Sequence, residues 1–182
     1  AEGSIIYSQI NSEEEIDDSF RVPFRHLSML AQIRSEDNEV LLALENGGYI
    51  SSSKKPSKKL VEKLSKIRYW IQSEHFPSDL RIEIHKDIDF DLIHKFDFEV
   101  SDYLNLLFTR LEGLSEWDSL SISKAITSPA KELNLNLGDV YSLLYVIFLG
   151  KKSGPKLARL LQELDKKTVC NLIHDAATKK TL

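Results

Sequence analysis

The spacing of apolar residues predicts that the chain is helical almost throughout. After a polar, acidic lead, two short amphipathic helices are expected over residues 20–31 and 37–44, and Gly47–Gly48 ends the second. Residues 51–57, with the sequence SSSKKPS, have the composition of a linker. They precede a long amphipathic helix whose apolar side carries Leu60, Leu64, Ile67 and Ile71.

The second half of the chain repeats the helical period with clearer stop signals. One helix is expected from Val100 to Leu111, and Ser115 with Asp118 forms a possible capping box for the next. Pro129 falls inside that next helix and is expected to kink or divide it. Three helices should follow: a buried one over 139–149 stopped by Gly150, one opened by Pro155, and one capped by Asp165.

Residues 76–99 have the weakest pattern. Leu80, Ile82 and Ile84 alternate with polar residues, which permits a short strand near 80–86 at most. The expected fold class is therefore all-α, with helical bundles in two parts divided near Gly113. The predicted domains are residues 1–112 and residues 113–182, the second a bundle of three to four helices.

Composition excludes several classes of protein. A hydrophobic content of 42% and a charged content of 29% are those of an ordinary soluble protein, and no apolar run approaches the roughly 18 residues that span a bilayer. The acidic start lacks the features of a signal peptide, so we expect it to lie inside a longer protein. The single cysteine, Cys170, excludes internal disulfides and is expected to be a buried core residue.

The net charge of −4 is unevenly distributed. Residues 1–50 carry 3 Lys and Arg against 10 Asp and Glu, which gives −7, whereas residues 146–182 carry 8 against 3, which gives +5. This asymmetry indicates a polyanionic partner for the C-terminal end, and a solvated basic tail is the alternative.

Motifs for catalysis are missing from the sequence. The five histidines include no pair at i, i+4, and no dinucleotide fingerprint, phosphate loop or nucleophile elbow is present. Lys63-Leu64-Ser65-Lys66 resembles the K-M-S-K-S signature of class I synthetases, but it falls in the middle of the long predicted helix. We therefore interpret it as part of an amphipathic helix, not as a mobile ATP-binding loop.

The strongest candidate for binding is the basic stretch Gly150–Lys156. A new helix beginning at Pro155 would present free N–H groups and a positive dipole to an anion. Lys151, Lys152, Lys156 and Arg159 would add charge beside it, as contact with a phosphate backbone requires. The alternative is a loop whose lysines only confer solubility. Trp117 is the aromatic residue most expected to be exposed, as a stacking platform for an unpaired base.

Two segments resemble a known family. Val140–Tyr145, followed by Phe148–Lys151 and then Gly154-Pro155, resembles the C-terminal signature of class I lysyl-tRNA synthetases, in which a buried helix leads into G-K-x-x-G-P and a final helical pair. Val22–Leu27 is similar to the V-P-F-R-x-L opening of the region after the family's catalytic domain. Residues 51–99 match loosely, and Pro129 departs from the family's uninterrupted helix.

The resemblance implies a fold, a partner and a parent enzyme. The fold would be an α-helical cage, with residues 1–112 as the connector bundle and residues 113–182 as the anticodon-binding bundle. Its partners would be the anticodon arm of tRNA(Lys) and the catalytic domain of the full-length cytoplasmic lysine–tRNA ligase, with no membrane. ATP would belong to that parent, so the chain alone would hold no cofactor or metal and would not be an enzyme. The corresponding region of a glutamyl-type enzyme and a helical protein–protein scaffold are the alternatives.

Overall fold

The structure is a computed structural model that describes residues 17–178, and all regular secondary structure in that range is helical. This confirms the all-α prediction. Two 3-10 turns, η1 and η2, accompany nine α-helices in the described range. The elements are η1 (Asp18–Phe20), α1 (Phe24–Ile33), α2 (Asp37–Asn46), α3 (Lys58–Gln72), η2 (Ser78–Leu80), α4 (Phe90–Ile93), α5 (Val100–Glu112), α6 (Ser119–Glu132), α7 (Leu137–Leu149), α8 (Leu157–Gln162) and α9 (Lys166–Thr178).

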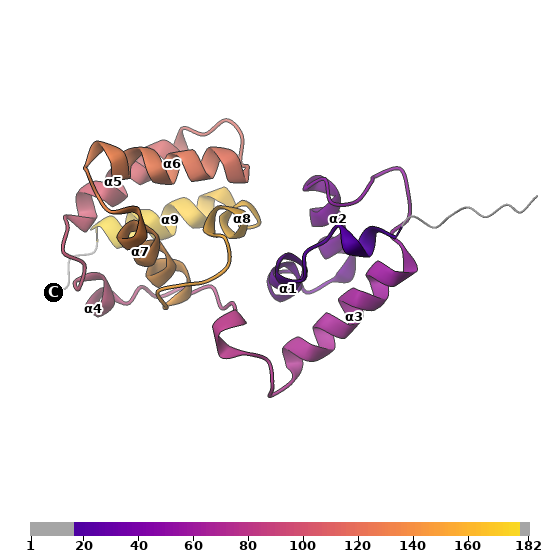
Figure 1. Ribbon diagram of the computed structural model, residues 1–182. Helices are drawn as coiled ribbons and strands as arrows, with labels where there is room; N and C mark the ends of the chain where they lie inside the picture. Colours follow the sequence, from indigo (N-terminus) through magenta and orange to yellow (C-terminus); the bar gives the residue numbers. More distant parts are fainter. Residues whose placement is uncertain (1–16, 179–182) are drawn as a thin grey trace, which may run out of the picture.

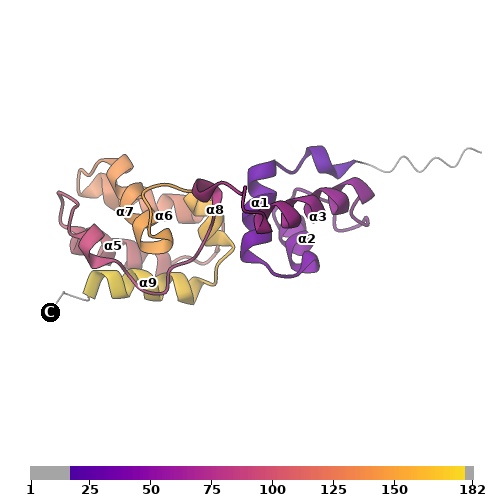
Figure 2. The ribbon, with the colours of Figure 1, turned by 90° about the horizontal axis from the view of Figure 1, so that it is seen from below.

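Helices α1, α2 and α3 form the smaller of two bundles (Figures 1 and 2). The amphipathic pattern explains their packing, since Leu30, Leu44 and Leu64 are fully buried between them. The side chain of Ser57 caps α3 by accepting from the backbone N–H of Leu60 at 3.2 Å. The long helix and the linker before it were both correctly predicted.

Helices α4 to α9 form the larger bundle. The predicted central helix, α7, is buried on most sides, and Gly150 ends it with a φ of 65°. Helix α5 packs along α9 and α6 (Figure 1). Because α5 and α6 pack together, the expected boundary between residues 112 and 113 lies inside this bundle of helices. The functional division into two domains stays a prediction. Cys170 is buried on α9, as expected.

Local signals at the helix ends were correct in part. Asp165 accepts from the N–H of Thr168 at 2.9 Å and caps α9, as predicted. Asp118 itself caps α6, accepting from Ser121 at 2.8 Å, so no capping box with Ser115 forms. Pro129 does not divide α6, which continues from Ser119 to Glu132, and the kink expected there stays a prediction.

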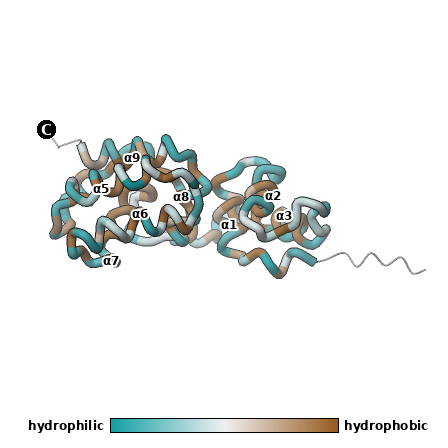
Figure 3. Tube along the Cα trace, turned by 90° about the horizontal axis from the view of Figure 1, so that it is seen from above, coloured by the Kyte–Doolittle hydropathy of each residue, from teal (hydrophilic) through white to brown (hydrophobic). Residues whose placement is uncertain are grey.

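The segment between the bundles contains no strand within the described residues. After η2 the chain is irregular up to α4, and its backbone makes one hydrogen bond to α7, from His85 N–H to the carbonyl oxygen of Phe148 at 2.8 Å. The alternation of residues 80–86 instead places Ile82 and Ile84 against the core. Apolar residues gather on the inner sides of both groups of helices, which leaves polar residues outside (Figure 3).

Candidate nucleic-acid interface

The loop after α7 owes its path to two glycines. Gly150 has a positive φ, and a Cβ there would lie 2.3 Å from Cε1 of His85. At Gly154, whose φ lies outside the left-handed region, a Cβ would lie 2.7 Å from Cδ1 of Leu149. Gly150 therefore needs glycine because of its φ and the His85 ring, whereas at Gly154 the nearest atom is the end of a flexible leucine side chain. The hydroxyl of Tyr145 fixes the end of the loop by donating to the carbonyl of Pro155.

The lysines of this loop have different environments. The Nζ atom of Lys151 donates to the carbonyl oxygens of Asp79 at 2.9 Å and Arg81 at 2.7 Å, so it ties the inter-bundle segment to the larger bundle. Lys152 and Lys156 are exposed. The predicted opening of the next helix at Pro155 is wrong by two residues, since α8 begins at Leu157. Helix α8 has six residues, which gives it little dipole for an anion.

Arg159 lies at the boundary between the bundles. Its Nη1 atom donates to the hydroxyl of Tyr49 at 2.9 Å, and the Tyr49 ring stacks on the His26 ring with centroids 4.6 Å apart. Burial lowers the pKa of His26 to about 4, and the nearby charge of Arg159 contributes to this shift. The imidazole is therefore neutral near pH 7, and the positive charge at this point comes from Arg159.

Trp117 is not the exposed platform that the sequence predicted. Its indole N–H donates to the carbonyl oxygens of Leu161 at 3.1 Å and Leu164 at 3.0 Å. The Leu161 carbonyl lies in the last turn of α8 and also accepts from the N–H of Leu164 at 3.1 Å, so the indole adds a second donor there and supplies the donor for the Leu164 carbonyl just beyond the helix. The structure gives Trp117 a role in holding α8, and its contact with RNA stays a prediction.

A cleft of about 510 Å³ lies between the bundles and brings the two motif segments together. The start of α1 forms one wall with Phe24, Arg25 and His26, and the loop before α8 forms the other with Gly154 and Pro155. Lys156 and Arg159 add positive charge opposite Arg25, against a single acidic side chain, Asp79. Sequence reasoning missed Arg25 and His26 as site residues, although both lie within the V-P-F-R-x-L motif.

A second hollow lies on the other side of His26 and Arg159. It is lined by Glu39, Asp118 and Glu163, and Arg34 is its other cation. Burial raises the pKa of Glu163, whose carboxylate lies 3.7 Å from Nη2 of Arg34. Because its acidic groups would repel phosphate, the basic cleft is the better candidate for a nucleic-acid strand.

The lysines of α3 form a further basic region. Leu64 is fully buried in the helix, which confirms that Lys63–Lys66 is not a loop. No group of three or more His, Cys, Asp or Glu in residues 17–178 is placed to hold a metal ion. No helix in that range is long and apolar enough to cross a membrane.

The model of the anticodon binding domain family matches residues 51–177. The chain belongs to this family. The match covers α3 and the whole larger bundle of this anticodon binding domain, including the loop and α8 wall of the cleft.

Relatives extend the similarity beyond the residues that the family model matches. The lysine–tRNA ligase of Thermoplasma acidophilum is 29% identical over 175 residues, which is 93% of this chain and 32% of the relative. That of Methanocaldococcus jannaschii is 28% identical over 156 residues, 81% of this chain and 29% of the relative. The glutamate–tRNA ligase of Mycoplasma genitalium is 32% identical over 71 residues, 39% of this chain and 15% of the relative. The chain spans about a third of the length of the lysine–tRNA ligases it matches.

Proposed function

We propose that this chain recognises the anticodon arm of tRNA(Lys) as the non-catalytic part of a class I lysine–tRNA ligase. The observation that carries the proposal is the cleft, where Arg25 on one wall lies opposite Lys156 and Arg159 on the other. Cations on two walls suit a single strand whose phosphates follow the opening and whose bases enter the cleft.

The chemistry of the parent enzyme would occur outside this chain. A catalytic domain would activate lysine with ATP in the cytoplasm and attach it to tRNA, while this domain holds the other end of the same tRNA. The chain alone should therefore form no lysyl-adenylate and need no cofactor. The loop and α8 would supply the predicted contacts, with Lys152, Lys156 and Arg159 facing RNA more directly than Lys151, whose Nζ is already bound to two carbonyls.

Glutamate tRNA is the second candidate ligand, because a glutamate–tRNA ligase matches part of the chain. Titrating the chain with transcripts of both tRNAs at several salt concentrations separates the candidates. We expect salt-sensitive binding in which tRNA(Lys) competes best. Preference for tRNA(Glu) would favour the glutamyl-type alternative. Failure to bind either tRNA at any of the salt concentrations would contradict the proposal and favour a protein–protein scaffold.

A further inference from the structure

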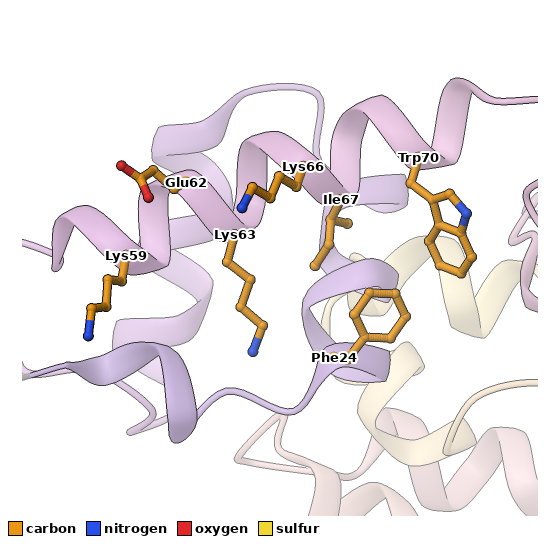
Figure 4. Close-up of a pocket in the computed structure, with 7 residues that line it drawn as sticks. All are labelled: Phe24, Lys59, Glu62, Lys63, Lys66, Ile67 and Trp70. Atoms are coloured by element: carbon orange, nitrogen blue, oxygen red, sulfur yellow. The ribbon is translucent and has the colours of Figure 1, made fainter.

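A third hollow, of about 660 Å³, runs along α3 (Figure 4). Phe24 lines both this hollow and the basic cleft, so the two spaces adjoin at this side chain. We call this hollow the α3 groove. It is lined by Phe24, Lys59, Glu62, Lys63, Lys66, Ile67 and Trp70.

The charge of the α3 groove is positive, with three lysines against Glu62. Lys63 is held in the fold, since its Nζ atom donates to the carbonyl oxygens of Ser19 and Val22, both at 2.9 Å. Lys59 pairs with Asp17 at 3.0 Å but keeps 71% of its side chain exposed. Lys66 is exposed and makes no ion pair or hydrogen bond with the described residues. Lys66 lies seven positions after Lys59, which is about 10 Å along the helix.

The end of the α3 groove nearest the cleft is aromatic. The centroids of the Phe24 and Trp70 rings lie 5.3 Å apart. On its other side the Trp70 ring packs edge-on against Phe76, with centroids 4.8 Å apart. Phe24 is 40% exposed, which is unusual for a phenylalanine held in an aromatic cluster. An aromatic face next to a line of lysines is the arrangement that proteins use to bind single-stranded nucleic acid.

We propose that the α3 groove binds the RNA strand that continues out of the cleft. One unpaired base stacks at Phe24, and the phosphates that follow it contact Lys66 and then Lys59. This inference rests on the proposed function and extends it from the cleft to a track that crosses the smaller bundle. An acidic peptide would match the lysines but would leave the aromatic end without a base to stack.

The test compares fluorescently labelled oligouridylates of increasing length, tRNA(Lys) and a glutamate-rich peptide. They are titrated against the wild-type chain, Lys66→Gln, Phe24→Leu and the cleft variant Lys156→Gln. Lys124→Gln is the matched control, because Lys124 is an exposed lysine on α6, outside both hollows. Circular dichroism confirms that each variant is folded.

For wild type, affinity should rise with oligonucleotide length as the strand reaches the α3 groove. Lys66→Gln should remove part of this rise and reduce the salt slope by about 0.7, and Phe24→Leu should weaken the longer strands about fivefold or more. If Lys156→Gln weakens every RNA while Lys66→Gln and Phe24→Leu leave the length dependence unchanged, the groove inference is wrong and the proposed function stands. Tight binding of the peptide with no effect of these variants on RNA would also overturn it. Failure of the wild-type chain to bind any RNA, tRNA(Lys) included, would overturn both proposals.

Discussion

The interior of the larger bundle and the boundary between the two bundles are held by different interactions. Helix α7 buries Leu143, Leu144, Ile147 and Phe148 completely. Across the boundary no helix among the described residues packs extensively on a helix of the other bundle. Side-chain hydrogen bonds add to the apolar contacts that join the two bundles there. They join Arg159 to Tyr49, Arg34 to Glu163, Gln32 to Leu80 and Ile82, and Lys151 to Asp79 and Arg81.

This difference separates stability from recognition. A buried aromatic or leucine side chain contributes several kcal/mol, whereas one hydrogen bond contributes about 1 kcal/mol net. The basic cleft lies at the boundary, where a change in side-chain position costs least. Substitutions in α7 should therefore act on unfolding, and substitutions at the boundary should act mainly on RNA binding.

The largest expected effect is on α7. Phe148→Ala should lower the free energy of unfolding by about 3–5 kcal/mol, because it leaves a cavity among fully buried neighbours. Urea denaturation measures the change. The control is Leu120→Ala on α6, where a side chain 65% exposed should cost no more than about 0.5 kcal/mol. Equal costs for the two variants would contradict the assignment of α7 as the centre of the core.

Trp117→Phe should come next. The ring is kept but the indole N–H is lost, so the carbonyl oxygen of Leu164 loses this donor and that of Leu161 keeps only the backbone N–H of Leu164. We expect a loss of about 1–3 kcal/mol in urea denaturation, with tRNA affinity unchanged in folded protein. A variant of normal stability that binds tRNA weakly would instead support the sequence-based prediction of Trp117 as an RNA contact.

Lys151 and Lys152 offer a matched pair with opposite expectations. Lys151→Met should reduce stability by about 1 kcal/mol, because two carbonyls of the inter-bundle segment lose a donor. Lys152→Met should leave stability unchanged, since that side chain is exposed. In tRNA titrations Lys152→Met should have the larger effect and should reduce the salt slope of binding more than Lys151→Met does. Identical behaviour of the two variants would show that the inward contact of Lys151 is unimportant.

A further prediction concerns pH. The pKa of His26 is lowered to about 4 in the folded chain, so the unfolded chain binds a proton first as pH falls below about 6.5. Folding stability should therefore decline between pH 6.5 and 4. His26→Phe should show a smaller decline in urea midpoint between pH 7.5 and 5. The raised pKa of Glu163 acts in the opposite direction, but it is present in both proteins and cancels in the difference. An equal decline in both proteins would mean that His26 titrates normally.

Sequence patterns predicted what single segments determine by themselves. The apolar stripes of α3 and α9, the stop at Gly150 and the cap at Asp165 are local, and the structure confirms them. The Ser115 capping box was wrong because one side chain, Asp118, was enough to cap α6.

The boundary could not be predicted in the same way. The carbonyl partners of Lys151 lie about 70 residues earlier, in the segment with the weakest sequence pattern. Trp117 looked exposed because its partners belong to the end of α8, which is distant in sequence. Arg25 and His26 were quoted as part of a motif, yet only the fold shows that this motif lies opposite Lys156.

The most direct test of the account measures tRNA(Lys) binding by variants of the two cleft walls. Arg25→Gln and Lys156→Gln are titrated singly and together over a range of salt concentrations, beside Lys124→Gln. Each cleft substitution should weaken binding and reduce the salt slope by about 0.7–0.9, and the double variant should lose about twice as much. Folded cleft variants whose affinity and slope match those of Lys124→Gln would contradict the assignment of this cleft as the tRNA site.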